Sequence, residues 1–270
     1  MKIYLLLILT LVLCTSCQQK KVSSFDFNGK RIMVELINDK RDSIVNGFGT
    51  TTYDNGNIKS IAFFENGTVK DTMYFFYQNG KIEAKGLLKN GLVNKWWSYY
   101  RQDGSLKELK EYYQREGDTV LENQVKVYDR YGNLELNKSN FFELEIPDTI
   151  ILGKNIARVK SYVADTSKIE ERFLTVIVEN EYSDSKIKKD TFSDGTLQPY
   201  FGVYGPKKGK HLIKGIIEDK TILSDELVKD SAKIVIVNHY KIFEKNVYVT
   251  ENEDEVSALQ KRLLREIRNK

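Results

Sequence analysis

The stretch FYQNGKIEAKGLLKNGLVNKWW, residues 76–97, contains two Asn-Gly pairs, Asn79-Gly80 and Asn90-Gly91, which stand 11 residues apart. Asn-Gly is a preferred centre of two-residue hairpin turns, because both positions of such a turn take a positive φ. Between the pairs, from residue 81 to residue 89, apolar and charged side chains alternate. Alternation with period two is typical of a strand with one buried face. The stretch therefore predicts strands joined by tight turns.

The same signal recurs on both sides of this stretch. Glycines preceded by Asn or Asp follow one another at intervals of 11, 13, 11 and 13 residues, and they are Gly56, Gly67, Gly80, Gly91 and Gly104. The period is therefore 24 residues, or two strands and two turns, and apolar side chains such as Ile58 and Ile82 repeat with it. A repeat of this kind buries its apolar face only by stacking on its neighbours. We expect an antiparallel β-hairpin meander over residues 25–140, with a two-residue turn at each glycine.

The repeated residues resemble a known family, the MORN-type repeats of the toxin–antitoxin-associated variety. The matching residues are Tyr53, Asn55, Gly56, Tyr77, Asn79, Gly80, Asn90, Gly91, Trp97, Tyr100 and Gly104. The resemblance covers about residues 43–134. The second glycine of the family pattern is kept at Gly47, but Asp71 and Lys95 replace it in the next two copies. The resemblance implies an elongated meander that binds proteins or membranes, and it brings no catalytic residue.

The first 16 residues, MKIYLLLILTLVLCTS, place one Lys before an apolar run. The run is too short to span a membrane comfortably and is typical of a secretory signal peptide, here residues 1–16. Small residues directly before Cys17 resemble the lipobox of bacterial lipoproteins. This resemblance implies that Cys17 is acylated and becomes the new N-terminus; the alternative is an ordinary cleaved signal followed by an unrelated Cys. Acyl chains anchor a protein firmly, since each buried methylene contributes about 0.8 kcal/mol.

After the anchor, residues 17–24 are polar and predict a short tether. Gln18 and Gln19 follow Cys17, in place of the acidic residue that is linked to inner-membrane retention in some bacteria. We therefore expect the outer membrane. Cys14 and Cys17 are the two cysteines of the chain, so the mature protein has no pair from which to form an intramolecular disulfide.

The second half of the chain has a different pattern. Short β-rich runs at residues 148–250, separated by Asp, Ser, Gly and Lys, predict a β-sandwich-like domain, plausibly immunoglobulin-like. Residues 253–270 place apolar side chains at helical spacing and predict an amphipathic helix. We expect this helix to dock on its own protein, the alternatives being a membrane or a partner. The acidic run ENEDE, residues 251–255, predicts favourable charge at the helix N-terminus rather than a cation site.

The sequence contains no recognisable catalytic motif. There are 2 His residues and no recognisable metal, nucleophile or phosphate-binding motif, so no enzyme, no metal and no cofactor are predicted. The net charge of +4 comes from 42 basic and 38 acidic residues. Such a small excess indicates solubility rather than nucleic-acid binding.

Two segments are binding candidates. Trp96 and Trp97 are strand neighbours, so one should pack and the other should be at least partly exposed, although both could be covered. The segment at residues 199–211 mixes aromatic and basic side chains and could grip an anionic lipid head or a glycan, although an ordinary loop is the simpler interpretation. The candidate binding residues are Trp96, Trp97, Tyr99, Tyr100, Tyr204, Lys207 and Lys208.

Together these features predict a mainly β, lipid-anchored, non-enzymatic protein that binds or scaffolds an envelope protein or an envelope glycan. Two other functions stay open at this point. One is a hydrolase or enzyme accessory acting on an envelope polymer. The other is an antitoxin or immunity function, which the repeat family suggests.

Overall fold

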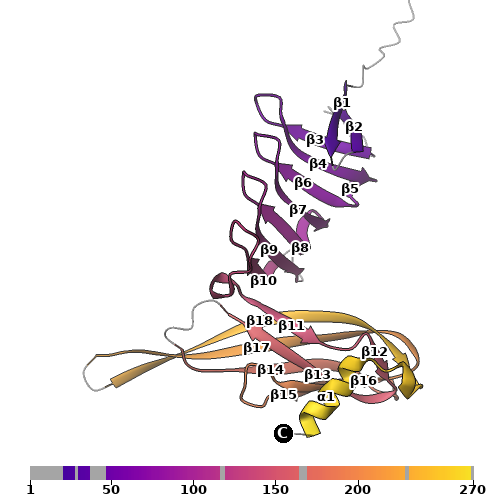
Figure 1. The fold of residues 1–270 in the computed structure, drawn as a ribbon, viewed down its shortest axis with the longest axis vertical. Helices are drawn as coiled ribbons and strands as arrows, with labels where there is room; N and C mark the ends of the chain where they lie inside the picture. The colour runs from indigo at the N-terminus through magenta and orange to yellow at the C-terminus, as the bar shows by residue number, and fades with distance from the viewer. Residues whose placement is uncertain are drawn as a thin grey trace, which may run out of the picture.

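The computed structural model of the chain describes residues 21–27, 30–36, 47–115, 119–163, 169–228 and 231–268. The predicted fold class is confirmed: the chain is mainly antiparallel β-structure, and its one described α-helix lies at the C-terminal end. It has two parts, a one-layer meander whose strands stack along the long axis and a sandwich at the base of that stack (Figure 1). The predicted signal peptide and Cys17 lie outside the described residues.

The meander is a sheet with the strand order β10-β9-β8-β7-β6-β4-β3, in which each strand of this path pairs with its neighbour in the chain and β5 pairs with β4. Its strands are β3 (Gly47–Thr52), β4 (Ile58–Glu65), β5 (Thr68–Val69), β6 (Thr72–Phe76), β7 (Ile82–Lys89), β8 (Leu92–Tyr100), β9 (Leu106–Gln114) and β10 (Val120–Val127). Before it stands a separate hairpin of β1 (Lys21–Phe27) and β2 (Lys30–Leu36), of which β2 lies against β3. Residues 21–24, predicted as tether, are therefore part of β1.

The turns of the meander are of two alternating kinds, which corrects the prediction of a two-residue turn at every glycine. At Asn66-Gly67 and Asn90-Gly91 both residues have a positive φ, between 51° and 78°, as a two-residue turn requires. At Gly56, Gly80 and Gly104 only the glycine has a positive φ. These three turns carry one more residue, and the glycine N–H bonds back to a carbonyl three residues earlier. The longer turn accounts for one of the two residues by which the intervals of 11 and 13 differ, and the irregular strand segments that contain Asp71 and Lys95 account for the other.

Side chains at the longer turns join one repeat to the next. The Tyr53 hydroxyl donates to the carbonyl of Phe76 at 2.6 Å, and the Tyr77 hydroxyl donates to the carbonyl of Tyr100 at 2.7 Å. Arg101 takes the same place one repeat later, and its guanidinium donates to the carbonyl of Tyr128. The Tyr of the repeated pattern therefore has a structural role, because it holds neighbouring hairpins together.

The positions of the second family glycine are irregular in each copy. Gly47 and Lys95 have a positive φ, +103° and +56°. Asp71 lies in the break between β5 and β6, where its carboxylate accepts the N–H of Thr72 at 2.6 Å. Positive φ is uncommon for a side chain as large as that of Lys, so Lys95 is held in a strained conformation by its surroundings.

The sandwich consists of two sheets with the orders β11-β13-β16 and β12-β18-β17-β14-β15. Its strands are β11 (Phe141–Glu145), β12 (Thr149–Ile151), β13 (Gly153–Tyr162), β14 (Ile169–Glu181), β15 (Ile187–Phe192), β16 (Tyr200–Gly205), β17 (Gly209–Val228) and β18 (Ser231–Thr250). Alternate residues of both sheets meet in one buried core that includes Val159, Val176 and Ile217, each with no exposed area. Lettered in chain order from β11 to β18 as A, A′, B, C, C′, E, F and G, the two sheets read A-B-E and A′-G-F-C-C′, with β12 parallel to β18. This is the strand order of an immunoglobulin-like sandwich that lacks strand D, so the topology agrees with that part of the expectation.

Three boundaries differ from the predicted ones. The sandwich begins at β11, at Phe141, whereas residue 148 was expected. The segment 199–211 is mostly two strands, β16 and β17, with a short exposed turn at Lys207 and Lys208, so the interpretation as a long loop is wrong. Strand β15 was not predicted, because its sequence IKKDTF is polar and lies at the edge of its sheet.

The C-terminal helix α1 (Ala258–Arg268) docks on the sandwich, as expected. Its Leu263 is fully buried, and α1 contacts β13. In the amide orientation that satisfies both groups, the Gln260 side chain donates to the carbonyl of Ile156 at 3.0 Å and accepts from its N–H at 3.2 Å. The pairing of β11 with β13 stops at Arg158, so the backbone of Ile156 has no partner in β11, and the Gln260 side chain of α1 takes its place.

The acidic run before α1 does not lie in its first turn, which corrects the sequence-based expectation. Glu253–Glu255 form a separate 3₁₀ turn, η2, and a second 3₁₀ turn, η1, spans Leu136–Lys138. The Glu255 carboxylate accepts from the Thr250 hydroxyl at 2.7 Å, and Gln260 N–H donates to the Ser257 hydroxyl, which caps α1.

No helix among the described residues is both long enough and apolar enough to cross a membrane.

The meander and the sandwich meet through polar contacts. Asn123 of β10 forms a two-point pair with the backbone of Ile242 in β18: the amide donates to the carbonyl at 2.8 Å and accepts from the N–H at 2.7 Å. Lys95 donates to Glu244 at 2.8 Å and to the hydroxyl of Tyr113 at 3.2 Å. Lys95, which has the strained backbone conformation, therefore joins the meander to the sandwich through its side chain.

Candidate functional site

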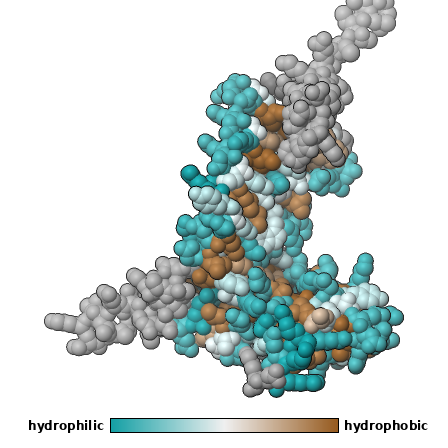
Figure 2. All heavy atoms as spheres, in the orientation of Figure 1, coloured by the Kyte–Doolittle hydropathy of each residue, from teal (hydrophilic) through white to brown (hydrophobic). Residues whose placement is uncertain are grey.

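One face of the meander carries an apolar groove, which we call the meander groove. It encloses about 520 Å³ and is lined by Met73, Phe75, Glu83, Ala84, Leu88, Gly91, Val93, Trp97 and Tyr99. These residues come from β6, β7, β8 and the turn between β7 and β8. Most of them share one face of the sheet as alternate strand residues, and Glu83 joins them at the register shift between β6 and β7. Hydrophobic residues run along the meander between hydrophilic strand ends (Figure 2).

Trp97 forms the base of the meander groove. It is 2% exposed, and its indole N–H donates to the carbonyl of Leu87 at 3.0 Å. The ring lies directly on Gly86, because a Cβ at that position would come within 2.3 Å of the ring. Phe75 and Tyr99 lie beside it, with ring centroids 6.2 and 6.3 Å away. A one-layer sheet buries a Trp in this way by laying it flat over a glycine.

A polar border continues from the groove onto β9 and β10. The hydroxyls of Tyr99 and Tyr112 are 2.9 Å apart. Burial raises the pKa of Tyr99 well above its usual value, and the bond to Tyr112 adds to the shift, so the phenol stays neutral. Beside them, the Lys110 ammonium lies 3.0 Å from the Glu122 carboxylate. The groove is therefore apolar at one end and bordered by hydroxyls and paired charges at the other.

The structure brings Trp97 and Tyr99 together but separates them from the other two aromatic candidates. Trp96 faces the opposite side of the sheet, is 39% exposed, and has Lys126 over its ring at 5.9 Å. Tyr100 has Lys85 over its ring at 5.7 Å. The expectation that neighbouring Trp residues face opposite ways therefore describes their placement correctly.

The candidates in the sandwich are separated as well. Tyr204 lines a second hollow, where its ring packs 4.6 Å from that of Tyr182. Lys207 and Lys208 are exposed in the turn after β16 and do not line that hollow. Nothing in the sequence pointed to Tyr182 or to Asp190, whose carboxylate accepts from the Tyr182 hydroxyl at 2.6 Å, because Tyr182 follows the end of β14 and Asp190 lies in the unpredicted β15. Met73 and Phe75, by contrast, are apolar residues that repeat with the period of 24 residues, and that repeat would have indicated the groove.

The part of the chain that the structure describes contains no group of three or more His, Cys, Asp or Glu side chains placed to hold a metal ion. Comparisons with protein families, with curated proteins and with solved structures give no match.

Proposed function

We propose that this protein is a lipid-anchored, non-enzymatic binding protein of the cell envelope, whose meander groove takes an apolar segment of a partner protein. The observation that carries the proposal is the groove itself: a hollow of about 520 Å³ lined mainly by apolar and aromatic side chains on a one-layer sheet. Aromatic and Met side chains are enriched where proteins bind one another, and apolar pockets hold the residues that contribute most to binding.

The lining favours a protein segment over a glycan in this groove. Met73, Leu88 and Val93 are partly exposed and offer no hydrogen bonds, whereas the buried indole N–H of Trp97 already has its acceptor. Against these three side chains a sugar would leave hydroxyls unpaired, which costs free energy. An apolar side chain has no hydrogen bonds to lose there.

The order of the parts supports a role at a membrane. The signal peptide and Cys17 would fix the N-terminal end, and the meander lies between that end and the sandwich in the chain. The sheet path from β3 to β10 has six inter-strand steps. At about 4.8 Å a step this amounts to about 29 Å. The meander would thus serve as both spacer and binding surface, with the MORN-like repeat supplying the stack.

The groove can be tested with a matched pair of variants on one strand. Leu88 lines the groove, whereas its neighbour Leu87 faces the other side and is 42% exposed. A photo-crosslinking probe placed in the groove should capture the partner segment in the wild-type chain. We expect Leu88→Arg to abolish this capture and Leu87→Arg to leave it unchanged. Equal crosslinking in both variants, with both shown to be folded, would refute a groove-bound partner.

The anchor is tested separately. Cys17→Ser should move the full chain from the membrane fraction to the soluble fraction, because the acceptor of the acyl chains is lost. A Cys17→Ser protein that remains membrane-bound after a high-salt wash would refute the lipid anchor, while leaving the groove proposal to its own test.

A further inference from the structure

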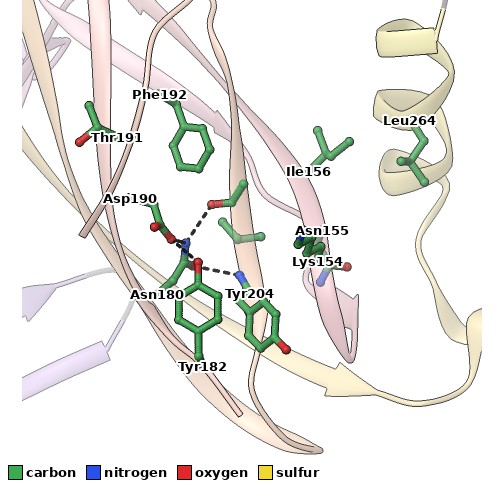
Figure 3. A pocket seen from close by; sticks show the side chains of 12 residues that line it. Lys154, Asn155, Ile156, Asn180, Tyr182, Asp190, Thr191, Phe192, Tyr204 and Leu264 are labelled. Atoms are coloured by element: carbon green, nitrogen blue, oxygen red, sulfur yellow. Dashed lines mark hydrogen bonds between the residues drawn. The ribbon is translucent and has the colours of Figure 1, made fainter. Parts of the chain in front are cut away.

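The sandwich has a second hollow, which we call the sandwich trough, on the outer face of its three-stranded sheet. Strands β13 and β16 form its floor, Leu264 of α1 forms one wall, and β14 with β15 forms the other (Figure 3). The trough encloses about 660 Å³. This volume lies within the range of about 300–1,000 Å³ that is usual for small-ligand sites.

One end of the trough carries a fixed carboxylate. Oδ2 of Asp190 accepts a hydrogen bond from the Tyr182 hydroxyl at 2.6 Å and another from the Asn180 amide at 2.8 Å. Asn180 is itself 4% exposed and is held by the backbone of Gly202 and Tyr204. Among the described residues, nothing donates a hydrogen bond to Oδ1 of Asp190. Oδ2 therefore holds the carboxylate in position, and Oδ1 can accept a hydrogen bond from a ligand.

The hydrogen-bond partners of Asp190 keep its carboxylate ionised. The hydrogen bonds from Tyr182 and then Asn180 hold the pKa of Asp190 below its usual value, so it is ionised at neutral pH. The group therefore acts as a hydrogen-bond acceptor and offers no proton of its own.

The remaining surface of the trough is apolar and aromatic. The Phe192 ring lies on Gly202, where a Cβ would come within 3.1 Å of it. Tyr182 and Tyr204 have ring centroids 4.6 Å apart beside the carboxylate. Across the floor, Ile156 and Leu264 form an apolar wall (Figure 3). The trough therefore combines flat aromatic rings, an apolar wall and one free acceptor.

We propose that the sandwich trough binds a short N-acetylated oligosaccharide. Sugar hydroxyls would donate to the free oxygen of Asp190, the C–H face of a sugar ring would lie on an aromatic ring, and the acetamido methyl group would pack on the wall of Ile156 and Leu264. Binding of this kind follows the general pattern of mostly apolar sites with a few placed polar groups. The proposal is independent of the meander groove and names a different partner.

A cationic peptide is the main rival, because a carboxylate beside aromatic rings also suits an ammonium group. Two charges of the chain oppose it. The Lys188 ammonium already lies over the Tyr182 ring at 5.3 Å, and Lys154 lines the rim of the trough. A further cation would be repelled by both, whereas a neutral sugar would not.

The test is calorimetric titration of the detergent-solubilised mature chain with tri-N-acetylchitotriose, with maltotriose and trilysine as comparison ligands. We expect the acetylated trimer to bind, and Asp190→Asn to weaken it at least about tenfold, because one acceptor becomes a donor. Leu264→Gln, on the opposite wall, should also weaken it. The matched control is Asp184→Asn in the exposed turn between β14 and β15, which should leave the affinity unchanged.

Three outcomes would overturn the proposal. The first is no heat of binding with the acetylated trimer. The second is equal affinity in wild type, Asp190→Asn and Leu264→Gln, because the sugar would then bind elsewhere. The third is tighter binding of trilysine than of the trimer. A loss of affinity in Asp190→Asn counts only when its circular dichroism and melting temperature match those of Asp184→Asn.

Discussion

The meander and the sandwich stabilise β-strands in different ways. In the meander each strand of the sheet path pairs with its neighbours in the chain, and the turns of one repeat bond to the next through Tyr53 and Tyr77. In the sandwich, two sheets enclose a core of fully buried side chains that come from segments far apart in the sequence. A one-layer sheet therefore depends on local contacts that repeat along the chain, whereas a two-layer sheet depends on contacts between distant segments that do not repeat.

The buried charges of the sandwich should give the largest effect, since the described meander has no equivalent. Asp219 is 1% exposed and pairs with Arg172 and Lys241, which are 5% and 3% exposed. Asp219→Asn leaves two buried cations without a counter-charge and should lower the free energy of unfolding by about 3–5 kcal/mol. Urea denaturation of the variant and the wild type measures this difference in the free energy of unfolding. The control Asp148→Asn, at an exposed ion pair with Lys245, should cost less than about 1 kcal/mol.

Two glycines under aromatic rings compare the two parts directly. A Cβ at Gly215 would lie 2.3 Å from the Phe243 ring and 2.6 Å from the carbonyl oxygen of Ile177, whereas the three atoms nearest to a Cβ at Gly86, from 2.3 Å, all belong to the Trp97 ring. The Ile177 carbonyl is held in the ladder between β14 and β17 and cannot move aside, whereas the Trp97 side chain can shift because no second sheet covers it. We expect Gly215→Ala to cost about 3 kcal/mol and Gly86→Ala about 1 kcal/mol in urea unfolding. Equal losses would show that the meander face is as rigid as the sandwich core.

The pH dependence of stability should come from Lys241. Burial lowers the pKa of Lys241 from 10.5 to about 8, although Asp219 opposes the shift. The unfolded chain therefore holds this proton up to higher pH than the folded chain, so stability rises as the pH rises above 8. We expect a gain of about 2 kcal/mol between pH 8 and 9.5, measured by unfolding at fixed salt. Lys241→Met should remove most of this slope; an unchanged slope would assign it to other groups.

The smallest expected effect is that of one inter-repeat hydrogen bond. Tyr77→Phe removes the bond to the carbonyl of Tyr100 and should cost about 1 kcal/mol, because a half-buried carbonyl loses its donor. The control Tyr131→Phe, at a turn residue that is 91% exposed, should leave the melting temperature unchanged. A loss at Tyr77 no larger than the loss at Tyr131 would mean that strand pairing alone holds the hairpins together.

The sequence predicted the meander well because its determinants are local. The Asn-Gly and Asp-Gly positions and the period of 24 residues place the hairpins correctly, and helical spacing places α1. The two kinds of turn were missed because Asn55-Gly56 and Asn66-Gly67 look alike as dipeptides, while the extra residue lies before the pair. The sandwich trough could not be predicted, because Asp190, Gly202 and Leu264 meet only through packing across three elements.

The covered ends of the meander have a consequence for how the protein behaves among its own copies. Strand β2 lies against β3 at one end, and at the other end Val125 of β10 bridges to Asn140 while Asn123 bonds the backbone of β18. A stack of similar hairpins with open ends would be a template for end-to-end growth into filaments, since unpaired strand edges recruit further strands. With β3 covered by β2 and β10 by Asn140 and β18, neither outer strand of this sheet presents an open edge to a further copy, and the number of its strands is set within one chain.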